Sequence, residues 1–290
     1  MLPRNSQFFY VRFLARFPAF DYSRHRGIVG MKSLKRWSIV LAFAAVAAAQ
    51  TPGSIGSIFG PGLAAQLAIA DTVPISSFAL PQLAFGGGWY TGIYFNNRTS
   101  DPLSANVFFF DANGLPLPVP AIGSSTTVTL PPAGTAIVEV PNNGALQQGW
   151  ARVDAPDGMV GYGVFRYTAP GQPSQLSEGV SPFVSTSTTF SSLIFDDTTY
   201  VTSVAFANPS GVMASINIRA ISAAGQVIGT ATQTLGPGAR TAIVLRNVAG
   251  LESVAGQRGA VEFSATTGAV SVLGLRFNNL TFTSIPPSSR

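Results

Sequence analysis

The stretch WYTGIYFNN at residues 89–97 decides the fold, because it recurs as YVTSVAFAN at residues 200–208. Both copies alternate apolar residues with small polar ones, which is the pattern of a β-strand with one buried face. The odd-numbered residues from 89 to 95 are matched in the second copy, so we expect their side chains to point into a core. The other parity, which holds Tyr90 and Tyr94, differs between the copies, and we expect it to face outward.

The repeat extends well beyond this strand. The matching blocks are residues 89–117 with 200–228, 129–132 with 234–237, 135–138 with 241–244, and 149–167 with 259–277. The third block repeats TAIV unchanged, and the fourth aligns Arg166 with Arg276. Blocks that keep one order along the chain indicate a tandem duplication of a whole domain.

Each copy carries strand and turn signals and lacks a long stretch of helical periodicity. Asn113-Gly114, Pro131-Pro132 and Pro156-Asp157-Gly158 mark tight turns between runs rich in Val, Ile, Thr and Phe. About eight short strands in roughly 105 residues predict an antiparallel β-sandwich for each copy.

Three motifs carry a resemblance to a known class of domains. They are GGGWYT at residues 86–91, FFDANG at 109–114 and GLRFNNLTFTSIP at 274–286. With these motifs the chain resembles uncharacterised Ig-like β-sandwich tandem repeats of secreted bacterial proteins. The resemblance implies the fold and export from the cell, and it transfers no catalytic residue. The predicted fold class is all-β, with two tandem antiparallel β-sandwich (Ig-like) domains at residues 75–185 and 186–290.

Residues 31–49 have the order of a signal peptide. Basic residues at 32, 35 and 36 precede an apolar run at 37–49 that ends in three alanines. As a helix this run spans about 20 Å, less than a bilayer core of about 30 Å, which favours a cleaved signal over an anchor or a core helix. We interpret residues 1–30 as a mis-called upstream extension, the alternative being a long n-region, and residues 50–74 as a flexible lead.

The charge changes once the signal is set aside. The chain has 17 Lys and Arg against 12 Asp and Glu, a formal charge of +5. Residues 1–49 hold eight of the basic residues, one acidic residue and the only histidine, which leaves nine basic and eleven acidic residues in the exported part. This weakens the electrostatic case for nucleic acid as a partner. With no cysteine and no histidine after residue 49, the exported part has no Ser–His–Asp triad, no Cys–His pair and no cysteine-ligated metal.

Few residues remain as candidates for a site, and we expect no catalytic residue, cofactor or resident metal. Tyr90 and Tyr94 form the candidate ligand face, roughly 13 Å apart along the strand. With Tyr162 they form an exposed aromatic patch, pack on the partner domain or belong to an ordinary sheet face. The acidic pairs at 154/157 and 196/197 are interpreted as loop residues rather than a glycosidase pair or a Ca²⁺ site. The aligned arginines are interpreted as structural, with shared ligand recognition as the alternative.

These observations predict a secreted, non-catalytic structural or interaction protein of adhesion or matrix type. The alternative is a carbohydrate-binding module that uses Tyr90 and Tyr94 as platforms for sugar rings. The expected localisation is extracellular or periplasmic. The expected partner is an extracellular polymer or protein, with no nucleic acid and no membrane span after signal cleavage.

Overall fold

The computed structural model describes residues 74–169, 171–279 and 281–289. The strands are β1 (Ile75–Phe85), β2 (Trp89–Asn97), β3 (Leu103–Asp111), β4 (Ser125–Leu130), β5 (Thr135–Val140), β6 (Gln147–Pro156), β7 (Met159–Ala169), β8 (Gln172–Pro182), β9 (Val184–Ser185), β10 (Phe190–Asp196), β11 (Val201–Ala207), β12 (Ala214–Ser222), β13 (Val227–Leu235), β14 (Arg240–Val244), β15 (Arg258–Thr267), β16 (Ser271–Asn278), β17 (Thr281–Ile285) and β18 (Ser288–Ser289). Two 3-10 helices, η1 (Leu245–Asn247) and η2 (Glu252–Val254), follow β14. The predicted upstream extension, signal peptide and lead, as far as residue 73, lie outside the described residues.

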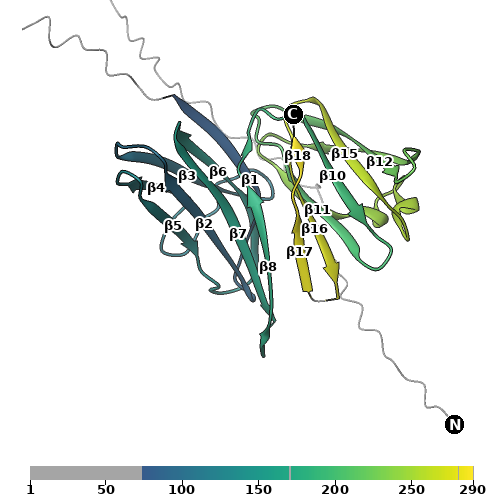
Figure 1. Ribbon diagram of the computed structural model, residues 1–290, viewed down its shortest axis with the longest axis horizontal. Helices are drawn as coiled ribbons and strands as arrows, with labels where there is room; N and C mark the ends of the chain where they lie inside the picture. The colour runs from purple at the N-terminus through teal and green to yellow at the C-terminus, as the bar shows by residue number, and fades with distance from the viewer. Residues whose placement is uncertain (1–73, 170, 280, 290) are drawn as a thin grey trace, which may run out of the picture. The chain divides into compact units, whose positions relative to one another are not determined.

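The strands pair into four small antiparallel sheets (Figure 1). We name each sheet by one inner strand: the β3 sheet (β4-β3-β6-β1-β9), the β2 sheet (β5-β2-β7-β8), the β12 sheet (β13-β12-β15-β10-β18) and the β11 sheet (β14-β11-β16-β17). One apolar cluster, which includes Phe95 and Phe109, joins the β2 and β3 sheets. A second, which includes Phe206 and Phe263, joins the β11 and β12 sheets.

The prediction of two tandem antiparallel β-sandwich (Ig-like) domains is wrong. The chain is all-β, but its small sheets are arranged as a four-bladed β-propeller rather than as two such domains. The strand order also departs from the immunoglobulin pattern, which places the first strand beside the second and the seventh beside the sixth. Here β1 pairs with β6 and β7 pairs with β2, and the second half repeats this with β10–β15 and β16–β11. Local alternation identifies strands one at a time, whereas the choice of neighbour depends on contacts between distant parts of the chain.

Each half of the chain anchors its central strand with a buried asparagine. The Nδ2 of Asn97, at the end of β2, donates to two carbonyl oxygens of nearby loops at 2.7 and 3.0 Å. The Nδ2 of Asn208, just after β11, donates to the corresponding pair at 2.7 and 2.9 Å. Both side chains are fully buried, so the repeated asparagine satisfies carbonyl groups that have lost their hydrogen bonds to water.

The repeated TAIV motif does not occupy equivalent positions in the two halves. Ile137 of β5 lies opposite Tyr94, on the outward face of β2. Ile243 of β14 lies opposite Val204, which is fully buried in the core. Because a shift of one residue inverts the faces of a strand, the same four letters present opposite side chains to the core.

Arg166 and Arg276, which the sequence alignment equates, also lie on opposite faces. Arg166 pairs with Tyr90 on the outward face of the β2 sheet, whereas Arg276 pairs with the buried Thr202. The registers show one extra residue between β15 and β16, which the ungapped alignment passed over. The equivalence of the two arginines is therefore wrong.

Side chains of the two halves also bond to one another. Trp150 of β6 donates from Nε1 to the carbonyl oxygen of Gly238 at 2.7 Å. The buried Arg240 of β14 donates to the side-chain oxygens of Gln82 and Gln148, and burial lowers its pKa to about 10. The boundary between residues 185 and 186 stays a prediction.

Candidate functional site

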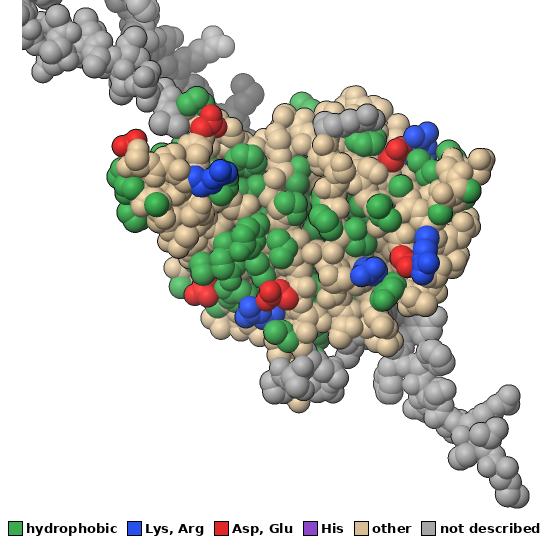
Figure 2. Space-filling view, viewed as in Figure 1, with side chains coloured by type: hydrophobic (Ala, Val, Ile, Leu, Met, Phe, Trp, Pro, Cys, Tyr) green, Lys and Arg blue, Asp and Glu red, His purple; other side chains and the backbone are tan. Residues whose placement is uncertain are grey.

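The predicted ligand face lies on the β2 sheet. Tyr90 and Tyr94 have the parity opposite to the buried side chains of Thr91, Ile93 and Phe95, as expected. Tyr94 lies between Tyr162 of β7 and Ile137 of β5. We call this surface the tyrosine face, and it consists of Tyr90, Tyr94, Ile137, Val160, Tyr162 and Val180. Ile137 and Tyr162 keep 49% and 44% of their surface exposed, and Figure 2 shows apolar side chains gathered over β2 and β7 with charged groups at the margin.

The centre of the tyrosine face is a stacked pair of rings. The ring centroids of Tyr94 and Tyr162 lie 5.3 Å apart, and the ring planes differ by 10°. Such offset stacking is a favourable arrangement for two aromatic rings. One flat side of each ring is therefore covered by the other, and a ligand meets ring edges and the outer sides of the pair.

Gly92 allows the tyrosines of β2 to lie close to the strand. A Cβ atom at this position would lie 2.8 Å from the hydroxyl oxygen of Tyr90 and 3.1 Å from Cε2 of Tyr94. Both rings therefore lean over the glycine from opposite sides. The requirement at Gly92 is space for these rings.

Charged groups hold Tyr90 at the margin of the face. Its hydroxyl donates to Oε1 of Glu139 at 2.8 Å, and the guanidinium of Arg166 lies 5.3 Å from its ring centroid. Burial, together with the hydrogen bond to Glu139, raises the pKa of Tyr90 well above its ordinary value. Arg166 also forms an ion pair with Glu178 at 2.8 Å, and the hydrogen bond to this carboxylate raises the pKa of Arg166. Tyr90 is thus a tethered side chain, unlike the stacked pair beside it.

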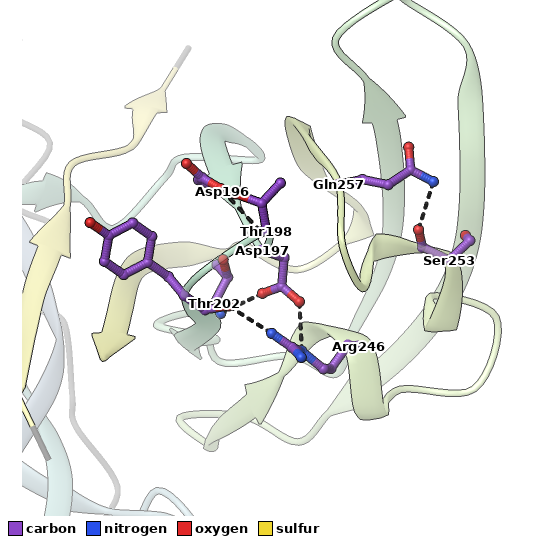
Figure 3. A network of polar contacts seen from close by, with 8 residues as sticks. Asp196, Asp197, Thr198, Thr202, Arg246, Ser253 and Gln257 are labelled. Atoms are coloured by element: carbon purple, nitrogen blue, oxygen red, sulfur yellow. Dashed lines mark hydrogen bonds and ion pairs between the residues drawn. The ribbon is translucent and has the colours of Figure 1, made fainter. Parts of the chain in front are cut away.

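The acidic pair at 196 and 197 belongs to a structural network (Figure 3). The side chain of Asp197 is fully buried; its Oδ2 lies 2.6 Å from Nε of Arg246, and its Oδ1 accepts the backbone N–H of Thr202 at 2.7 Å. Asp196 accepts hydrogen bonds from Thr198, which lower its pKa, and pairs with Arg258 at 2.8 Å. The interpretation as loop residues is wrong for Asp196, which is the last residue of β10, and Asp197 is a buried anchor of the loop that follows.

Arg276 has a partner of its own on the inner side of the β11 sheet. Its guanidinium lies 4.5 Å from the ring centroid of Tyr200. The arginine of the tyrosine face, Arg166, lies on the outward side of its sheet. Shared recognition of one ligand by these two arginines therefore has no structural support.

The second half buries the sheet face that corresponds to the tyrosine face. Leu273 and Leu275 of β16 and Phe282 of β17 are at most 8% exposed, although they lie on the outward side of the β11 sheet. Residues of the first half cover them, because the rings of Trp89 and Phe165 each lie 5.5 Å from that of Phe282. The two equivalent faces thus differ: one is an internal contact, and the other is open.

Sequence reasoning missed this contact and part of the tyrosine face, although signals for both exist. The run SVLGL at the start of β16 is apolar on both parities, which indicates a strand covered on both sides. In β5, the inward parity of Val138 and Val140 places Ile137 and Glu139 outward. Ile137 and Glu139 therefore belong to the surface around Tyr94.

Comparisons with protein-family models and with curated proteins find no match for this chain. Among the described residues, no helix has the length and apolarity to cross a membrane. In the same part of the chain, no three acidic, histidine or cysteine side chains gather as a group that could hold a metal ion.

Proposed function

We propose that this is a secreted, non-catalytic structural or interaction protein, of adhesion or matrix type, that binds its partner through the tyrosine face. The observation that carries the proposal is the contrast between the two equivalent sheet faces. The face with Leu275 and Phe282 is buried, whereas the face with Tyr94 and Tyr162 is aromatic, apolar and exposed. Exposed patches of this kind, rimmed by charge, are typical of binding surfaces.

Two surface hollows and one acidic pair agree with a non-catalytic role. Two hollows, one lined mainly by residues 182–189 and the other by glycines near 87 and 144, contain no ionisable side chain. The acidic residues Asp196 and Asp197 are paired with arginines. Neither of the two hollows places a general acid beside a general base, which is the arrangement that hydrolytic chemistry requires.

A protein partner fits the face better than a carbohydrate does. A sugar ring packs on a free aromatic face, but Tyr94 is stacked on Tyr162 and Tyr90 lies under Arg166. Tyrosine and arginine surrounded by aliphatic residues are the side chains that protein interfaces favour.

The test is to fractionate cells that make the protein and to follow the wild type and the Tyr94→Ala/Tyr162→Ala variant. We expect the wild type in the extracellular surface or matrix fraction and the variant in the medium. Ile194→Ala is the matched control, because Ile194 is 76% exposed on β10 of another sheet. Equal retention of all three proteins would contradict the proposal, and retention of the wild type on purified polysaccharide would favour the carbohydrate alternative.

A further inference from the structure

The contact between the two halves of the chain shows how a sheet face of this kind is covered. In the second half, Leu275 and Phe282 are covered by Phe165 of the first half, and two hydrogen bonds fix the contact. The backbone N–H of Val180 donates to Oγ of Ser284 at 3.0 Å, and that of Phe282 donates to Oγ of Ser177 at 3.3 Å. One copy of the repeat therefore already binds the outward face of the other.

The tyrosine face is the corresponding surface of the first half, and it is open. We infer that it binds the tyrosine face of a second copy of this chain, in a two-fold symmetric contact. This inference rests on the proposed function and names the partner. The second copy must present a surface that fits the tyrosine face, and the structure limits which of its surfaces are free to do so.

The surface that covers the β11 sheet is not free to act between chains. Phe165 is 1% exposed because it is already packed against Phe282. The second half has Tyr200 at the position of Trp89, but the register places Arg276, stacked on Tyr200, where the first half has Phe165, so this part of the covering surface is charged. A second copy is thus left with its own tyrosine face, and a contact between two identical patches is isologous.

The composition of the face suits such a contact. The stacked rings of Tyr94 and Tyr162 lie at its centre, where aromatic side chains contribute most to binding. Its margin carries both signs of charge, with Glu139 on one side and the Arg166–Glu178 pair on the other. A two-fold axis parallel to β2 places the Glu139 side of each copy over the Arg166 side of the other, so that opposite charges meet at the rim.

Sedimentation velocity of the purified protein over a roughly hundredfold range of concentration measures this self-association. We expect a reversible dimer for the wild type and a dissociation constant at least about tenfold higher for Tyr162→Glu, because a buried carboxylate then replaces a central aromatic ring. Ile194→Glu is the control and should dimerise as the wild type does, because its exposed side chain lies on another sheet.

A second measurement uses the absence of cysteine from the chain. Ile137→Cys and Ile194→Cys each introduce a single thiol. Under mild oxidation we expect a disulfide-linked dimer to form faster from Ile137→Cys, and Tyr162→Glu in the same chain should slow it. A wild type that stays monomeric at every concentration, or equal cross-linking of the two cysteine variants, would overturn the inference. If the protein is monomeric but the Tyr94→Ala/Tyr162→Ala variant still leaves the matrix fraction, the self-contact fails and the proposed function stands.

Discussion

Asp197 and Asp196 are neighbours of the same chemistry in very different surroundings, and replacing each by alanine should separate burial from charge. Asp197→Ala removes the partner of Arg246 and leaves the buried N–H of Thr202 without an acceptor. Breaking one side of a buried ion pair costs about 3–5 kcal/mol. Because Arg246 keeps 31% of its side chain exposed and water can reach it, we expect a loss near the lower end, about 3 kcal/mol.

Urea unfolding followed by circular dichroism at neutral pH measures this loss as a lower midpoint at an unchanged slope. For a folded region of this size, about 3 kcal/mol corresponds to a fall in Tm of roughly 6–12 °C. Asp196→Ala should change the midpoint far less, because its partner Arg258 is 65% exposed and is screened by water. If both variants lose the same stability, the reasoning from burial is refuted.

Three further predictions concern the anchor of β2 and the tyrosine face. Asn97→Ala should lower the free energy of unfolding by about 2 kcal/mol, because two buried carbonyl oxygens lose their hydrogen-bond donor. Asn96→Ala should cost less in the same urea assay, because the hydrogen bond from Asn96 Nδ2 to the carbonyl oxygen of Gly134 is long, at 3.5 Å. Because the pKa of Tyr90 is raised in the folded protein, the unfolded chain loses the phenolic proton at lower pH than the folded chain does. The stability that Tyr90 contributes is therefore present below about pH 10 and declines above it. Tyr90→Phe should show a shallower alkaline decline of the urea midpoint, and a decline identical to that of the wild type would contradict the raised pKa. Gly92→Ala should displace the rings of Tyr90 and Tyr94 and weaken binding at the face with the fold retained, which sedimentation and circular dichroism test together.

The outward position of Tyr90 and Tyr94 could be predicted from the sequence because it depends only on alternation along one strand. The match between the copies at residues 89–97 has no gap, and the buried Asn97 and Asn208 fix it at one end. The same reasoning was wrong for Arg276, because an alignment without a gap does not reveal the extra residue that precedes β16. The sheet arrangement was wrong for a different reason, since the pairing of β1 with β6 joins residues far apart in the chain.

For the site, the sequence predicted which side chains of β2 face outward, but it did not predict which side chains of other strands lie beside them. Tyr162 was named as a member of an aromatic patch, but its stacking on Tyr94 follows from the β2–β7 register. Ile137 and Val180 come from strands on either side, and local pattern does not say which strands those are. The burial of the equivalent face in the second half depends on packing between sheets, which no single strand encodes.

The extra residue between β15 and β16 decides how the two halves fit together. Compared with β6 and β7, this one residue exchanges the two faces of the strand that follows it. It brings Leu273 and Leu275 to the outward side of one copy, while Tyr162 lies outward in the other. The two halves are therefore not equivalent parts, because one supplies the covering surface and the other supplies the surface that is covered.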